Sequence, residues 1–75
     1  MTLRELTREL IKEYEGTQAA FAEHIGADAT ALSRWLNRYR HNHSYFVERL
    51  IEAYPWRESE IIAAWKAEMK AETKR

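Results

Sequence analysis

Apolar residues recur every three or four positions along most of the chain, which is the spacing of amphipathic helices. The first stripe consists of Leu3, Leu6, Leu10 and Tyr14, with Ile11 beside it. Thr2 and Glu5 fit a capping box, in which the hydroxyl and the carboxylate each accept a backbone N–H. We expect Gly16 to end this helix, because glycine tolerates the left-handed conformation that helix C-termini often need.

Two short helices follow, with a glycine between them. Thr17 is a good N-cap for the first, which ends at Gly26 and is expected to bury Phe21, Ala22 and Ile25. Asp28 can cap the second, whose inward positions are Leu32, Trp35 and Leu36. The side left towards solvent carries Ala29, Thr30, Ser33, Arg34 and Asn37. This second helix is too short to be stable alone, so tertiary packing must hold it.

The rest of the chain predicts a polar loop and two more helices. Residues 38–43 contain no aliphatic side chain and are expected to form the loop. A fourth helix, capped by Ser44 or Asn42 and ended by Pro55, carries Phe46, Val47, Leu50, Ile51 and Tyr54. A last helix over about 58–71, starting near Ser59, carries Ile61, Ile62, Trp65 and Met69. Since β-branched residues are few and scattered, we predict an all-α bundle of about five helices in one domain, residues 1–75.

Composition adds two expectations. A chain of 75 residues supports one modest core, and without cysteine it has no disulfide to reinforce it, so oligomerisation is plausible. The absence of cysteine fits a reducing compartment, and we find neither a signal peptide nor an apolar run near the roughly 18 residues that a membrane span needs. We therefore expect a cytoplasmic protein with no membrane partner.

The charge distribution matters more than the net charge. The formal net charge of zero argues at first against a nucleic-acid partner. However, residues 1–33 hold three basic and six acidic side chains, whereas residues 34–49 hold four basic and one acidic. The positive charge is thus concentrated at the end of the third helix and in the loop after it. His41 and His43 in that loop are expected to add charge as the pH falls, and so to strengthen polyanion binding in mild acid.

Residues 17–37 carry the most specific pattern in the chain. A sharp corner between two helices needs a small residue at their crossing and a residue free to take positive φ, and Ala22 and Gly26 meet these needs. Counted from Gln18, six residues stand where helix-turn-helix proteins of the phage Cro and C1 repressor type (XRE-like) place apolar, Ala, apolar, Gly, apolar and apolar residues: Phe21, Ala22, Ile25, Gly26, Leu32 and Trp35. The segment resembles this family.

The resemblance implies a lambda-repressor-like fold and a transcriptional regulator of a bacterial or phage-infected cell that binds a specific double-stranded DNA sequence. A Cro-like repressor is the favoured form, because the chain carries no separate effector or activation domain. A purely structural use of the helix-turn-helix is the less favoured alternative.

The resemblance also implies roles for individual residues. Thr17 and Gln18 would touch a phosphate at the start of their helix. Arg34 would pair with a guanine edge and Asn37 with an adenine, while Thr30 would contact a thymine methyl group. The recognition helix as a whole would present Asp28, Ala29, Thr30, Ser33, Arg34 and Asn37. The adjacent DNA backbone would be held by Arg38, Arg40, His41, Asn42 and His43.

Two positions depart from the family pattern. Relatives often have Gln where this chain has Ala29, which offers only an apolar contact. Asp28 is acidic at the edge of a proposed phosphate surface. It can accept from a cytosine amino group, but we favour its role as a helix cap.

The C-terminal part leaves two interpretations open. Together, Trp56, Ile61, Ile62, Trp65 and Met69 provide more apolar surface than four packed helices need, and Trp56, Ile62, Trp65 and Met69 are the candidates for a dimer interface. They either close the core over the first helix or pair with a second copy, which would make a homodimer on DNA with recognition helices about 34 Å apart. A competing function is a protein-interaction module that binds its partner through this aromatic helix. The neutral net charge and an acidic first helix, with Glu5, Glu9, Glu13 and Glu15, favour it.

Catalysis and metal binding have little support. His41 and His43 stand one residue apart, and only His24 lies elsewhere, which is a weak set of metal ligands without cysteine. The serines suit caps or groove-facing hydroxyls, and a chain this short builds no sizeable pocket. We expect no catalytic residue, no cofactor and no small-molecule ligand. Trp35 is expected to belong to the core.

Overall fold

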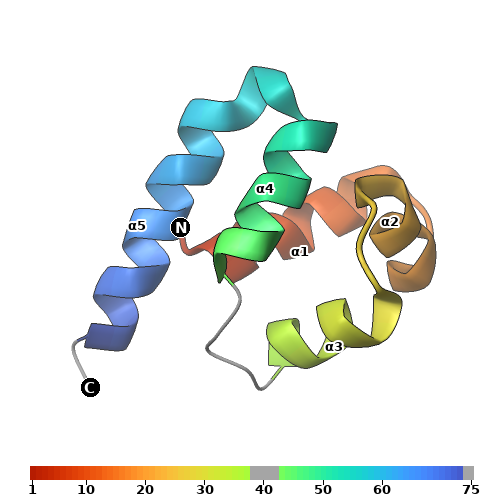
Figure 1. The fold of residues 1–75 in the computed structure, drawn as a ribbon, viewed down its shortest axis with the longest axis horizontal. Helices are drawn as coiled ribbons and strands as arrows, with labels where there is room; N and C mark the ends of the chain where they lie inside the picture. The colour runs from red at the N-terminus through yellow and green to blue at the C-terminus, as the bar shows by residue number, and fades with distance from the viewer. Residues whose placement is uncertain (38–42, 74–75) are drawn as a thin grey trace.

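The computed structural model describes residues 1–37 and 43–73, and this part of the chain is all-helical, with five α-helices and one short 3-10 helix and no strand. The elements are α1 (Leu3–Tyr14), α2 (Gln18–Ile25), α3 (Ala29–Asn37), α4 (His43–Ala53), η1 (Pro55–Arg57) and α5 (Glu58–Thr73). Figure 1 shows α4 and α5 side by side, with α1 behind α4 and the α2–α3 pair at the other end of the molecule. The predicted all-α bundle is confirmed.

The helices enclose one hydrophobic core to which every α-helix contributes. Helix α1 packs on α5 and α2, and α4 packs on α2 and α5. The core consists of Leu3, Leu6, Leu10, Phe21, Ala22, Ile25, Leu32, Trp35, Leu36, Phe46, Val47, Leu50, Ile61 and Ala64. Each predicted inward position of α2 and α3 lies in this set. None of the described helices is long and apolar enough to cross a membrane.

Helix α1 begins with the predicted capping box. The Glu5 backbone N–H donates to Thr2 Oγ1 over 3.3 Å, and the Thr2 N–H donates to Glu5 Oε1 over 2.7 Å. These hydrogen bonds, the one from the Thr2 backbone first, hold the pKa of the Glu5 carboxyl below its ordinary value of 4.5. The buried Thr7 hydroxyl donates to Leu3 O, so it packs in the core with its hydrogen bond made.

The end of α1 differs from the prediction. The left-handed residue is Glu15, with φ of 59°, one position before Gly16. A Cβ on Gly16 would lie 2.9 Å from the Tyr14 ring, so a larger residue there would have to displace that ring. That ring is half-exposed rather than buried and stacks on the ring of His24 at 4.9 Å. Tyr14 therefore covers the α1–α2 corner from outside.

The second half of the chain is shifted slightly from its predicted boundaries. Helix α4 already begins at His43, so Ser44 lies inside it and is not its cap, and Asn42 lies outside the described residues. Pro55 ends α4 as predicted but also opens the 3-10 turn η1, so that α5 starts at Glu58. On α5 the buried side chains are Ile61, Ala64 and Glu68, whereas Ile62 and Trp65 are partly exposed and Met69 is exposed.

Candidate nucleic-acid interface

The α2–α3 unit is held at its start and at its corner by local hydrogen bonds. Thr17 Oγ1 accepts from the Ala20 N–H over 3.0 Å, which confirms Thr17 as the N-cap of α2. At the corner the Ala27 N–H donates to Ala22 O over 2.8 Å, the bond that closes a Schellman-type helix end. Asp28 Oδ2 then accepts from the Ala31 N–H over 2.9 Å. The expected role of Asp28 as a helix cap is confirmed.

Gly26 and Ala22 fix the geometry of this corner. Gly26 has φ of 76°, a conformation that L side chains rarely adopt, and a Cβ there would approach the Arg49 guanidinium to 3.4 Å. Ala22 is completely buried. A larger side chain at that position would therefore force the two helices and the core apart.

Replacement of Gly26 by alanine is expected to lower the free energy of unfolding by about 1–2 kcal/mol, because it places a side chain in the left-handed region. Gly16→Ala is the matched comparison. Its φ is not positive, and the close contact of its Cβ would be with the half-exposed Tyr14 ring, so the substitution should cost less. Urea unfolding followed by circular dichroism measures both. If both variants lost the same unfolding free energy, the positive φ of Gly26 would not be the reason that a glycine is needed there.

Helix α3 presents a polar strip on the side opposite its core residues. Thr30, Arg34 and Asn37 are exposed, while Ala29 and Ser33 are partly exposed. Spacings of three and four residues place these side chains on neighbouring parts of one helix face. Among the described residues, none forms an ion pair with Arg34, which leaves its five N–H donors available there.

Two of the predicted contact residues are already engaged in hydrogen bonds. Asn37 Nδ2 donates to Ser33 O over 2.8 Å, so the amide folds back onto its own helix and must turn to read a base. The Thr17 hydroxyl accepts a backbone N–H as a cap but keeps its own proton for a further acceptor. Gln18 follows at the first helical position of α2 and is partly exposed.

The expectation that His43 lies in an exposed loop is wrong, and with it the expected contact to the DNA backbone. His43 is the first residue of α4 and is only 8% exposed. Its Nδ1 accepts from the Trp35 indole N–H over 2.9 Å, and its Nε2 lies 3.0 Å from Glu72 Oε2. Because the indole can only donate, Nδ1 must be deprotonated, so the bond to Glu72 is made by the Nε2 proton. The imidazole therefore joins α3 to α4 and α5.

The other residues assigned to the DNA backbone, Arg38, Arg40, His41 and Asn42, lie outside the described residues. Within the part that is described, no group of three or more His, Asp or Glu side chains is placed to hold a metal ion.

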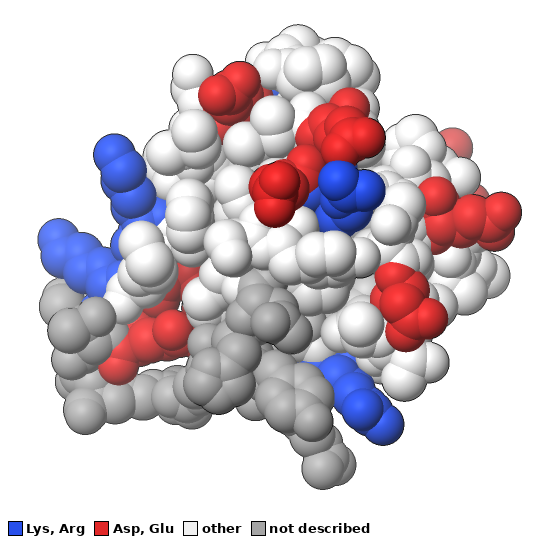
Figure 2. Space-filling view, in the orientation of Figure 1, with Lys and Arg blue, Asp and Glu red and all other residues white. Residues whose placement is uncertain are grey.

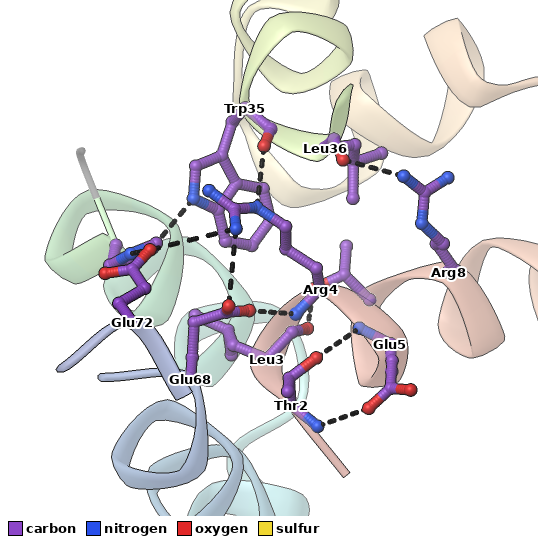
Figure 3. Close-up of polar contacts among 11 residues, drawn as sticks. Thr2, Leu3, Arg4, Glu5, Arg8, Trp35, Leu36, Glu68 and Glu72 are labelled. Atoms are coloured by element: carbon purple, nitrogen blue, oxygen red, sulfur yellow. Dashed lines mark hydrogen bonds and ion pairs between the residues drawn. The ribbon is translucent and has the colours of Figure 1, made fainter. Parts of the chain in front are cut away.

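Figure 3 shows a set of contacts at the C-terminal end of α3 that the sequence pattern does not predict. Arg4 Nε donates to Trp35 O over 2.8 Å, and Arg8 NH2 donates to Leu36 O over 2.7 Å. The last carbonyls of a helix lack partners within it and carry partial negative charge, which arginine complements. Two side chains of α1 thus cap the helix that bears the polar strip.

Arg4 is the centre of a network that also includes Trp35, His43, Glu68 and Glu72, which we call the Arg4 network. Its NH1 lies 3.3 Å from Glu68 Oε2 and 3.8 Å from Glu72 Oε2, and its guanidinium stands over the Trp35 ring at 5.6 Å. Glu68 is nearly buried, and its Oε1 also accepts the Arg4 backbone N–H in the first turn of α1. The network joins α1, α3, α4 and α5.

Charged side chains are unevenly spread over the surface. On the face drawn in Figure 2, acidic side chains gather over α4 and α2 around one basic side chain, and other basic side chains project at the margins, over α5 and beside α3.

Comparison with known proteins gives no relative from which to read a function: no protein-family model, no curated protein and no solved structure shows a significant match to the chain.

Proposed function

We propose that the chain is a sequence-specific double-stranded-DNA-binding regulator that inserts α3 into the major groove and acts as a Cro-like repressor by occupying its site. The observation that carries the proposal is the polar strip of α3, with the exposed Arg34 at its middle, which forms no ion pair with any other residue in the described part of the chain. An α-helix has the width that the major groove of B-DNA admits. Arginine is also the side chain that most often recognises guanine, through two parallel hydrogen bonds.

The hydrogen bonds that hold both ends of α3 support the same function. Asp28 caps its first turn, and Arg4 and Arg8 cap its last carbonyls. Base readout needs side chains held in a fixed register, because each bidentate pair depends on the position and angle of the helix. A helix used only to fill the bundle needs no exposed strip of donors.

Thr17 and Gln18 lie at the N-terminus of α2, where free backbone N–H groups and the helix dipole favour an anion. In the proposed complex they hold a phosphate and set the register of α3. The net charge of zero gives no general attraction to DNA, so affinity must come from such local contacts.

The test is a selection from random duplex DNA with the folded protein, followed by direct binding to the selected sequence. Arg34→Ala is expected to weaken binding by about 1–3 kcal/mol, or about five- to 150-fold, and to relax the preference at one base pair. The affinity of the wild type should fall steeply with salt.

Arg57→Ala is the control, since it removes the same charge from η1, at the opposite end of α4 from α3 (Figure 1). It should bind the selected site as the wild type does. No enriched sequence from folded protein, or equal binding by the Arg34→Ala variant, would contradict the proposal.

A further inference from the structure

The imidazole of His43 joins α3 to α5 through both of its ring nitrogens. Its Nδ1 accepts from the Trp35 indole N–H of α3 over 2.9 Å, and its Nε2 lies 3.0 Å from Glu72 Oε2 of α5. The two rings also meet edge to face, with centroids 6.0 Å apart. Because His43 is only 8% exposed, little water is available to replace either partner.

The contact acts on α3 because this helix is attached differently at its two ends. Its start follows α2 after a short corner, and α2 is the helix on which it packs most closely. Its last turn is held by side chains from other parts of the fold. Arg4 and Arg8 bond its carbonyls, while the Trp35 ring stacks on Phe46 and bonds to His43. Loss of one of these contacts therefore loosens the C-terminal half of the polar strip.

The bond to Trp35 exists only while His43 is neutral. An indole N–H can donate but cannot accept, and a neutral imidazole accepts at the nitrogen that carries no proton. In the imidazolium both nitrogens carry protons, so the Nδ1–H would face the indole N–H with 2.9 Å between the two nitrogens. Two donors at that distance repel each other. Protonation must therefore separate His43 from Trp35.

The charged groups around the ring allow it to keep its other partner. Glu72 of α5 faces Nε2, and Arg4 of α1 lies 3.8 Å from the same Glu72 oxygen and 3.3 Å from Glu68 Oε2 (Figure 3). Helix α4 carries apolar side chains one turn beyond His43, and the positive end of its dipole lies at that residue. An imidazolium would thus remain bound to Glu72, in a charge-assisted hydrogen bond, while it releases Trp35.

We propose that His43 is a proton-controlled latch on α3. The neutral ring fixes the last turn of α3 through Trp35, and the protonated ring, which histidine forms in mild acid, no longer does so. For DNA the consequence, which rests on the proposed function, is that binding by α3 weakens as the pH falls. This effect is opposite in sign to the one expected for His43 as an exposed loop residue, because the ring is buried instead of facing a polyanion.

An NMR titration of the isotope-labelled chain tests the latch without DNA. The Trp35 indole N–H signal is identified by its absence from the Trp35→Phe variant. We expect it to move upfield between about pH 8 and pH 5, because the proton loses its acceptor when His43 is protonated. The indole signals of Trp56 and Trp65 serve as references.

His43→Asn is the matched variant for this titration. Its Oδ1 is bonded to Cγ, as Nδ1 is in histidine, so it can accept the same indole proton but takes up no proton itself. The Trp35 signal of this variant should stay in place over the same pH range. Circular dichroism checks that the variant is folded, and the wild-type titration needs no variant at His43.

Binding to the selected DNA site gives a second readout. Between about pH 7.5 and pH 5.5 at constant salt, the wild type should lose about two- to tenfold more affinity than His43→Asn, as expected for one hydrogen bond. Comparison of these two chains cancels the charge that His24 and His41 add in both. His24→Asn, which changes an exposed ring, should follow the wild type.

The two readouts separate the latch from the proposed function. If no DNA sequence is selected, the proposed function fails, and the indole titration still decides on the latch. A Trp35 signal that stays in place in the folded wild type, or that moves as far in His43→Asn, would overturn the latch. Equal losses of DNA affinity by the wild type and His43→Asn would overturn its effect on binding by α3.

Discussion

Arg4→Met is expected to lower the free energy of unfolding by about 3–5 kcal/mol, because it removes one partner of a nearly buried ion pair. Glu68, with only 5% of its surface exposed, would lose the guanidinium that faces its carboxylate and would retain the hydrogen bond from the backbone N–H of residue 4. The carbonyl of Trp35 would lose its donor at the same time. Urea unfolding followed by circular dichroism measures this loss.

Arg8→Met is the matched control for Arg4→Met. It also removes a bond to the end of α3, over 2.7 Å to Leu36 O, but Arg8 has no buried carboxylate beside it. It should therefore cost about 1 kcal/mol. The double variant Arg4→Met with Glu68→Met should recover part of the loss, since no buried charge remains. An Arg4→Met chain as stable as the Arg8→Met chain would show that the Arg4 network contributes no more than a surface bond.

Trp35→Ala should cost about 3–5 kcal/mol, a large part of the stability of a small domain. The indole is 1% exposed and stacks on Phe46, with ring centroids 4.4 Å apart and planes inclined by 17°. Alanine leaves a cavity between α3 and α4 and removes the surface over which the Arg4 guanidinium lies. The expected result is a shift of the urea midpoint to much lower concentration, or a chain without cooperative unfolding.

Trp35→Phe distinguishes the contribution of the aromatic ring to stability from that of the indole N–H hydrogen bond. Phenylalanine keeps an aromatic ring on Phe46 but cannot donate to His43 Nδ1, so a buried acceptor loses its partner at a cost of about 1–3 kcal/mol. We expect Trp35→Phe to be clearly more stable than Trp35→Ala. If both variants lost the same unfolding free energy, the lost hydrogen bond, and not the lost packing of the ring, would account for the destabilisation.

The elements and their caps could be predicted from the sequence because their causes are local. Thr2, Thr17 and Asp28 each cap a helix by accepting a backbone N–H three residues further on. The apolar spacing of α2 and α3 likewise identifies every residue that they bury. Gly26 takes positive φ, as the corner between two helices requires.

The missed features depend on contacts between distant parts of the chain. His43 follows a polar run and looks like a loop residue, but its ring is buried by Trp35 and Glu72. On α5 the buried stripe runs through Ala64 and Glu68, which no apolar pattern marks, so the predicted face was rotated towards Ile62 and Met69.

In the candidate site, too, the features with local causes could be predicted and those that depend on distant contacts could not. The exposed strip of α3 follows from its periodicity, but its anchoring does not. The spacing of Arg4 and Arg8 places them on one side of α1. Nothing in the local sequence says that the end of α3 meets that side. Glu68 is identified as a partner of Arg4 only from the folded structure, in which α5 lies beside the first turn of α1.

Arg4 and Glu68 are 64 positions apart in the sequence, and this separation sets the order in which parts of the molecule form. Local turns of helix form first. Contacts that close so long a loop form late, because the chain loses conformational entropy on closing the loop before the contacts stabilise it. During synthesis the residues of α1, α2 and α3 are added well before Glu68 and Glu72. The network that holds the end of α3 can therefore form only after Glu68 and Glu72 have been synthesised, and a chain truncated before them lacks it.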